Sequence, residues 1–170
     1  MQQQEQCNWC WAAVAASLSS AMPPPQGMQV PMSQCQVASG VLGSNCCDDG
    51  HVLNGCPDSP CNQPALIQSA LGKIRHRGGA SGGVPSQATV MGHIDVGRPI
   101  VGEIHWNDDQ PQNHYVLIVD YSTNNSGVFV VKIADPADPT GTIPQCHSLD
   151  ELNAGGYRQF GQWIGSYFTV

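Results

Sequence analysis

The sequence predicts an α+β protein with helices in the first half of the chain and antiparallel strands in the second. Segments rich in alanine and leucine, bounded by capping residues, Pro and Gly, lie before residue 98. β-branched and aromatic runs separated by turn residues lie after it. Helices that precede strands, rather than alternate with them, are typical of segregated lobes. We expect one domain, 1–170, with a mainly helical, cysteine-rich lobe at 1–97 and a β-rich lobe at 98–170.

Four helices are expected in the first half. They are predicted over 9–22, around 33–43, within 61–78 and from 86 to about 96. Asn8 is a candidate cap for the first helix, which "PPP" at 23–25 stops, and Pro64 stands in the first turn of the third. The glycine-rich "GGASGG" at 78–83 is predicted to be a flexible joint.

Three strands and a hairpin are expected in the second half. The runs at 98–106, 114–122 and 127–135 are predicted strands, and "YRQFGQWIGSYFTV" at the end offers one or two more. The "TNNS" turn also matches a glycosylation acceptor, although a hairpin explains it equally well. A turn centred on Asn124 and Asn125 pairs positions whose numbers add to about 249, which places His114 opposite Asp135.

Composition excludes several classes of function. The net charge is −7, and basic residues gather only in "KIRHR" at 73–77, so nucleic acid is not an expected partner. No apolar stretch approaches the ~18–20 residues of a membrane span. Eight cysteines, five of them between 35 and 61, indicate an oxidising compartment and several cross-links. We expect a secreted protein whose leader is absent from this sequence, or a translocated bacterial effector; Met1 is followed by polar "QQQEQ".

Cys7 and Cys10 admit four interpretations. They could ligate zinc together with Cys56 and Cys61, or form a redox couple, although a thioredoxin-type couple needs a strand just before it. A structural disulfide is the preferred interpretation for Cys7. Cys10 lies in the first turn of the predicted helix, where the dipole favours a nucleophilic thiolate. Six residues before it, Gln4 carries an amide donor suited to an oxyanion.

These residues carry a family resemblance. Gln4, Cys7, Cys10 and Trp11 resemble the papain-like cysteine peptidase signature Q-x-x-C-x-x-C-W of clan CA. The resemblance implies that Cys10 is the nucleophile, that Cys7 is disulfide-bonded, and that the active site lies between the two lobes of a papain-like fold. "NWCWAA" is similar to the bacterial AvrRpt2-like and C39-like branches. The sequence departs from papain in its Asn8-Trp9 pair and in a shorter cysteine-to-histidine distance.

The partners of such a nucleophile are expected at strand ends. His114 opens the most apolar strand, which suits a general base aimed into a cleft, and the resemblance selects it too. His105 is the second candidate. Asp135, before Pro136, is the expected orienting carboxylate, and Asp138 is the alternative. The related bacterial branches carry Asp in a similar context, whereas papain itself has Asn.

The resulting prediction is a cysteine peptidase that hydrolyses peptide bonds through a thioester. Alternatives are an amidase, deamidase or transferase with the same triad, or a non-catalytic binding domain held by disulfides or zinc. No cofactor or metal, no membrane, a monomeric state and a protein or peptide substrate are expected. If Cys10 is reduced, the other seven cysteines form at most three disulfides. The resemblance implies that Cys7 bonds to a cysteine of the 46–61 cluster. The adjacent Cys46 and Cys47 are not expected to bond to each other.

Overall fold

The computed structural model describes residues 1–27, 30–47, 59–106, 113–138, 145–158 and 160–170. The chain divides into two compact units. Unit 1 comprises Met1–Arg77 and Pro136–Gly141, and unit 2 comprises Gly78–Asp135 and Thr142–Val170. The helical lobe was predicted to reach residue 97, but residues 78–97 belong to unit 2, because the segment from 77 onward joins the sheet.

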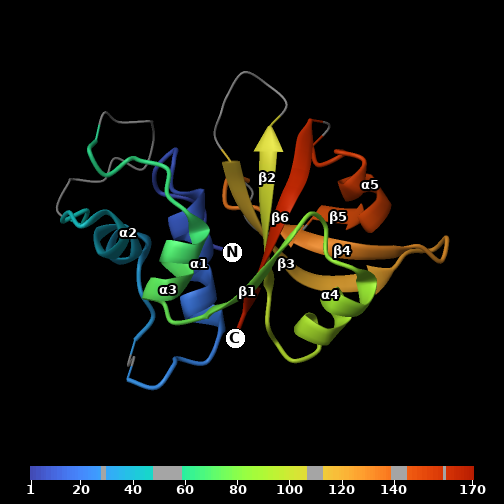
Figure 1. Cartoon of the computed structure of the whole chain (residues 1–170), viewed down its shortest axis with the longest axis horizontal. Helices are drawn as coiled ribbons and strands as arrows, with labels where there is room; N and C mark the ends of the chain where they lie inside the picture. Colours follow the sequence, from blue (N-terminus) through green and yellow to red (C-terminus); the bar gives the residue numbers. More distant parts are fainter. Residues whose placement is uncertain (28–29, 48–58, 107–112, 139–144, 159) are drawn as a thin grey trace. The chain divides into compact units, whose positions relative to one another are not determined.

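Unit 1 is built from three helices, α1 (Cys10–Ala21), α2 (Gln34–Leu42) and α3 (Ile67–Lys73), which pack on one another (Figure 1). Ten consecutive residues of α1 are buried, because its small alanine side chains let neighbours approach from all sides. Ser33 caps α2 with a full capping box, and Gly43 ends it in the left-handed conformation. None of the described helices is long and apolar enough to span a membrane.

Two helices of unit 1 begin later than predicted. Asn8 does not cap α1, because its main-chain N–H and its side-chain amide both bond to Asn62, and the cap position falls to Trp9. The third helix begins at Ile67, not near Pro64. The segment before it is held outside the helix by the indoles of Trp9 and Trp11, which donate to the carbonyls of residues 61 and 63 at 2.6 and 3.0 Å.

Disulfides hold the irregular part of unit 1. Cys35 bonds to Cys47 and Cys46 to Cys61, so the adjacent Cys46 and Cys47 have different partners, as predicted. Cys7 is also disulfide-bonded. We predicted that Cys7 bonds to a cysteine between residues 46 and 61. Cys46, Cys47 and Cys61 have other partners, and Cys56 lies outside the described residues. Such cross-links are typical of proteins that fold in oxidising compartments.

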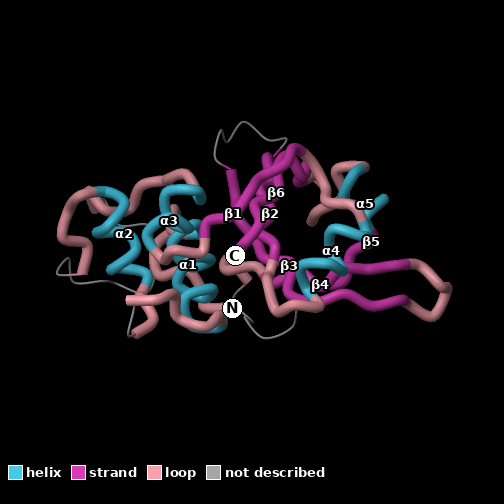
Figure 2. Tube along the Cα trace, turned by 60° about the horizontal axis from the view of Figure 1, so that its bottom comes forward, coloured by secondary structure: helices cyan, strands magenta, loops and turns pink. Residues whose placement is uncertain are grey.

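Unit 2 contains a six-stranded sheet in the order β1-β6-β2-β3-β4-β5 (Figure 2). The strands are β1 (Arg77–Gly82), β2 (Ile100–Trp106), β3 (Asn113–Thr123), β4 (Phe129–Ala134), β5 (Gln145–Ser148) and β6 (Gly161–Thr169). The helices α4 (Gln87–Ile94) and α5 (Leu149–Asn153) share one hydrophobic core with β2, β3, β4 and β6. Ser86 caps α4, as predicted. Helices followed by an antiparallel sheet match the predicted α+β class.

The predicted joint at 78–83 was wrong, because most of it forms strand β1. Glycine permits this pairing at Gly78, where a Cβ would lie 2.6 Å from the carbonyl oxygen of Phe168 on β6. Neither β5 nor α5 was predicted. Such short elements depend on neighbouring strands and helices for stability.

The hairpin register also differs from the prediction. Thr123 pairs with Phe129 and Leu117 with Ala134, a shift of two to three positions. The turn is longer than counted because the side chain of Asn124 accepts main-chain hydrogen bonds from residues 126 and 128, and a bulge interrupts β3 further along. Continuing this register places Asp135 opposite Val116 rather than opposite His114.

Candidate active site

Alternation along the strands of unit 2 carries three side chains to one end of the sheet. Ile104, Val116 and Ile133 belong to the buried core on one face. Side chains two residues apart share a face, so Trp106, His114 and Asp135 continue that face beyond the core. Ile104 pairs with His114, and β4 ends beside the start of β3, so the three side chains meet at the same edge. His114 and Asp135 therefore meet diagonally, in spite of the shifted register.

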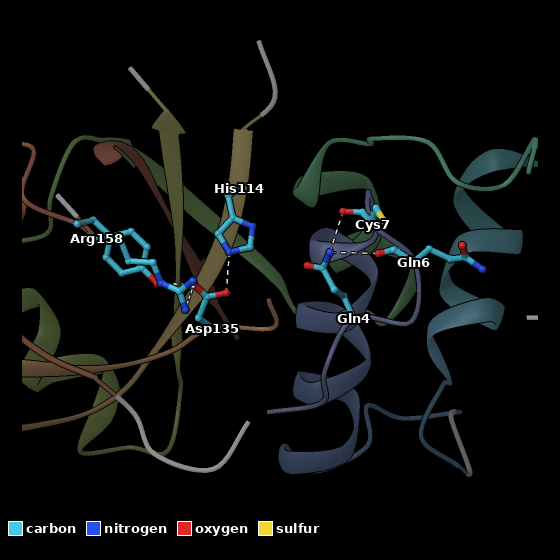
Figure 3. Close-up of polar contacts among 7 residues, drawn as sticks. Gln4, Gln6, Cys7, His114, Asp135 and Arg158 are labelled. Carbon is cyan, nitrogen blue, oxygen red and sulfur yellow. Dashed lines mark hydrogen bonds and ion pairs between the residues drawn. The ribbon is translucent and has the colours of Figure 1, made fainter. Parts of the chain in front are cut away.

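His114 and Asp135 form a buried pair. Nε2 of His114 lies 2.7 Å from Oδ1 of Asp135, and the two side chains are 10% and 2% exposed (Figure 3). An ionised carboxylate can only accept, so Nε2 carries the hydrogen and donates it. Nδ1 is then the ring atom that can accept a proton from a nucleophile.

Two further residues hold the second oxygen of the carboxylate. The hydroxyl of Tyr157 donates to Oδ2 of Asp135 at 2.6 Å, and the guanidinium of Arg158 contacts the same oxygen at 3.0 Å (Figure 3). Burial and the negative charge of Asp135 raise the pKa of Tyr157, so its hydroxyl stays a donor. Asp135 is thus fixed from both sides by three donors.

A tight loop delivers Tyr157 and Arg158. Tyr157 forms a bridge with Gly161, the first residue of β6, which in turn pairs with Trp106 of β2. Gly161 is required there, because a Cβ would lie 2.7 Å from a methyl group of Ile104. Arg158 has φ 45°, a conformation that costs about 1 kcal/mol for a residue other than glycine. The loop accepts this strain and places the guanidinium on Asp135.

Trp106 lines the histidine. Its ring stacks on that of His114 with a centroid separation of 5.9 Å and lies 6.1 Å from the ring of Tyr157. The sequence argument found neither Trp106 nor Tyr157 nor Arg158. Trp106 carried a usable signal, since a bulky aromatic ends a strand whose partner begins with the candidate base. Arg158 carried only the rarity of Lys and Arg, six in 170, and Tyr157 carried no such signal.

Cys10 lies in unit 1 as the first residue of α1. It is buried and carries a thiol, not half of a disulfide. Because Cys7 and Cys61 are both disulfide-bonded, the zinc interpretation that used them is wrong. The redox-couple interpretation is wrong as well, since Cys7 is not bonded to Cys10. No group of three or more His, Cys, Asp or Glu able to hold a metal occurs among the described residues.

Gln4 lies in the turn that leads into α1. Its Nε2 donates to the carbonyls of Gln6 and Cys7 at 3.1 and 2.7 Å (Figure 3), and its Oε1 is buried without a hydrogen-bond partner among the described residues. Its main-chain N–H bonds to the carbonyl of Pro136 at 2.9 Å. The segment is also held by the buried side chain of Gln34 on α2, which bonds to the backbone of residues 3 and 5.

The alternatives that the sequence offered are His105 for the base and Asp138 for the carboxylate. His105 alternates to the opposite face of β2 from Trp106, and its Nδ1 pairs with Oδ1 of Asn113. His147, which was not a sequence candidate, pairs with Glu151, and its ring lies 5.3 Å from that of Tyr157. Asp138 follows the 135–136 junction in unit 1.

Comparison with known proteins identifies a similar fold. No protein-family model and no curated protein sequence matches the chain. A crystal structure of the Amb a 11 cysteine protease, a major ragweed pollen allergen, in its proform, aligns with a TM-score of 0.53 and 16% identity over 99% of this chain and 55% of that chain. A second crystal structure of that proform gives a TM-score of 0.48 over 61% of its length.

The first alignment supports the predicted papain-like fold class. This chain spans little more than half the length of the proform to which it is similar. At 16% identity the likeness concerns the fold alone.

Proposed function

We propose that the chain is a papain-like cysteine peptidase with Cys10 as nucleophile, His114 as base and acid, Asp135 as orienting carboxylate and Gln4 as oxyanion donor. The observation that carries the proposal is the buried hydrogen bond between His114 and Asp135, which fixes one tautomer of the imidazole. A buried thiol at the start of a helix and the fold shared with a cysteine protease support it.

In the proposed mechanism, the sulfur of Cys10 attacks the scissile carbonyl while His114 holds a proton on Nδ1. The oxyanion of the tetrahedral intermediate accepts hydrogen bonds from the Cys10 N–H and from Gln4. His114 then passes its proton to the leaving amine, and a thioester remains. The imidazole finally activates water, which releases the acid and restores the thiol.

The role of Gln4 requires a change in its hydrogen bonds. An amide nitrogen has two hydrogens, and Nε2 already faces two main-chain oxygens. An oxyanion must therefore replace one of them as acceptor. An anion accepts more strongly than a neutral carbonyl, so we expect the exchange to be favourable once charge develops.

An amidase, deamidase or transferase with the same residues is the second candidate, because the triad serves acyl transfer in general. Mass spectrometry of a denatured protein that has been incubated with the chain distinguishes peptidase activity from these alternatives. Peptidase action yields shorter fragments, whereas deamidation leaves the length unchanged and adds about 1 Da per site. The substrate class proposed here is a protein or peptide. The disulfides support a secreted protein, and we propose a monomer. The sequence "NWCWAA" at 8–13 supports membership of the bacterial AvrRpt2-like or C39-like branch.

Thiol reactivity tests the nucleophile directly. The described residues contain two thiols, a buried one at Cys10 and an exposed one at Cys146. Exposure alone predicts that an alkylating agent modifies Cys146 first. The proposal predicts the reverse at acidic pH, and also that an epoxide inhibitor of papain-type enzymes modifies Cys10. Peptide mapping that finds Cys146 modified first, with Cys10 inert, would favour the non-catalytic alternative.

A further inference from the structure

We propose that Arg158, with Tyr157, is a positioning residue of the His114–Asp135 pair that sets how readily the imidazole releases its proton. The inference rests on the proposed function for its catalytic meaning. The contacts that carry it lie wholly within unit 2.

The geometry leaves the carboxylate no freedom. One oxygen of Asp135 accepts from His114, and the other accepts from Tyr157 and Arg158. The carboxylate is 2% exposed, so protein donors take the place of water. A rotation of the carboxylate toward His114 would break two bonds on the opposite side. The loop accepts an unfavourable φ at Arg158, so this contact is maintained at a cost in backbone conformation.

The charges determine the effect on the histidine. A carboxylate alone beside an imidazole strongly favours the imidazolium. Here Asp135 also pairs with the guanidinium of Arg158, which balances its negative charge. Protonation of His114 therefore gives the three side chains His114, Asp135 and Arg158 a net positive charge. Arg158 therefore weakens the hold of the imidazole on its proton. An imidazolium that releases its proton more easily is a better acid toward a leaving amine.

Trp106 and His147 also lie near this cluster of side chains in unit 2. Trp106 on β2 is neutral, and the Tyr157 hydroxyl stays protonated. Beyond Tyr157, His147 of β5 contacts the tyrosine ring and pairs with Glu151 of α5. Because His147 is a second histidine near Tyr157, its NMR signal and that of His114 must be observed separately.

The test is the NMR titration of His114 in the 170-residue chain carrying Cys10→Ala, which removes any coupling to the thiol. The His114 signal is assigned by its loss in His114→Gln. Arg158→Gln is expected to raise the titration midpoint by about one pH unit. Arg158→Lys restores the charge and returns the midpoint toward its original value. The matched control is Arg98→Gln, an exposed arginine of the same unit, which is expected to leave the midpoint unchanged.

An unchanged or lowered midpoint in Arg158→Gln overturns the proposal, as does an equal rise in Arg98→Gln. If Arg158→Gln does not fold, Tyr157→Phe decides. It removes a competing donor from Asp135, so a smaller rise supports the proposal and no rise overturns it.

Activity provides an independent measurement. With Cys10 intact, the alkaline limb of the kcat/KM profile of Arg158→Gln should move to higher pH. If the unmodified chain hydrolyses no peptide, the proposed function fails while the histidine titration still judges the role of Arg158.

Discussion

The carboxylate of Asp135 accepts from donors on both oxygens, which makes this position sensitive to a neutral substitute. In Asp135→Asn the amide nitrogen must face either His114 or the Tyr157–Arg158 side, and a donor meets a donor in both cases. We expect a loss of stability of about 2 kcal/mol and a fall in kcat of roughly 10²–10⁴-fold. Chemical denaturation and peptide hydrolysis measure the two effects.

Asp138→Asn is the matched control, since Asp138 precedes a proline in the same segment. It should leave kcat unaltered. Comparable losses in both variants would mean that the carboxylate was assigned incorrectly. Full activity of Asp135→Asn would mean that the site tolerates an amide, as papain does.

Cys10 and Cys7 are expected to fail in different ways. Cys10→Ala should abolish hydrolysis and shift the free energy of unfolding by only about 1 kcal/mol, because one buried sulfur is removed. Cys7→Ala should retain the nucleophile but lose about 2–5 kcal/mol of stability with its disulfide. Thermal unfolding and active-site titration distinguish the two outcomes. Turnover by Cys10→Ala at the unmodified rate would refute the nucleophile.

Individual site residues could be predicted from the sequence where their residue type and their position at a strand end pointed to a specific role. His114 and Asp135 were predicted to be in contact, and they are, because they lie at the adjacent ends of β3 and β4 with their side chains on the same face of the sheet. The predicted register was wrong, and the pair meets diagonally instead. Tyr157 and Arg158 could not be predicted, because their approach depends on a left-handed backbone at residue 158. Cys10 and Gln4 remain predictions for the chemical step.

Strand β2 depends on the absence of a side chain at Gly102. A Cβ there would lie 2.1 Å from the ring of Trp163 on β6, and the ring is buried in the core of the sheet. Gly102→Ala should therefore destabilise the chain by about 1–3 kcal/mol or more. Gly92→Ala in helix α4 meets nothing within 4 Å and should stabilise by about 0.5–1 kcal/mol.

Urea denaturation of the two glycine variants measures this contrast. Equal stability of Gly102→Ala and the unmodified chain would show that Trp163 can move aside. Loss of stability in Gly92→Ala would show that the helix has a tighter neighbour than the structure gives it.

The elements differ in how far they could be predicted. Helices α2 and α4 were located through Ser33 and Ser86, because a serine cap is a local signal. Strand β1 was missed because its glycines have no intrinsic preference for a strand, and only pairing with β6 orders them. The third helix was predicted too long, since the indoles of Trp9 and Trp11 hold its expected first turn in another conformation. In both cases distant residues decided the outcome.

For the whole molecule, cross-links are distributed unequally. The described disulfides and the bonded Cys7 all belong to unit 1, and Cys146 of unit 2 is a thiol. Loops of 12 and 15 residues contribute about 3 kcal/mol each when closed. A reducing agent should therefore remove hydrogen-exchange protection from the helices of unit 1 and leave most of it in β2 and β3.

Mass spectrometry of exchanged peptides gives this comparison, with Cys146→Ser as the control for reagent effects in unit 2. Uniform loss of protection in both units would mean that unit 2 has no stability of its own. Unchanged protection in unit 1 would mean that helix packing alone maintains it.

The two units interleave along the chain, and this has a consequence for biosynthesis. Gln4 emerges from the ribosome early, yet its main-chain N–H bonds to the carbonyl of Pro136, which emerges some 130 residues later. The turn that carries Gln4 stays without this anchor until most of the protein has been translated. A nascent chain thus acquires the tether of its proposed oxyanion donor only after Pro136 has been translated.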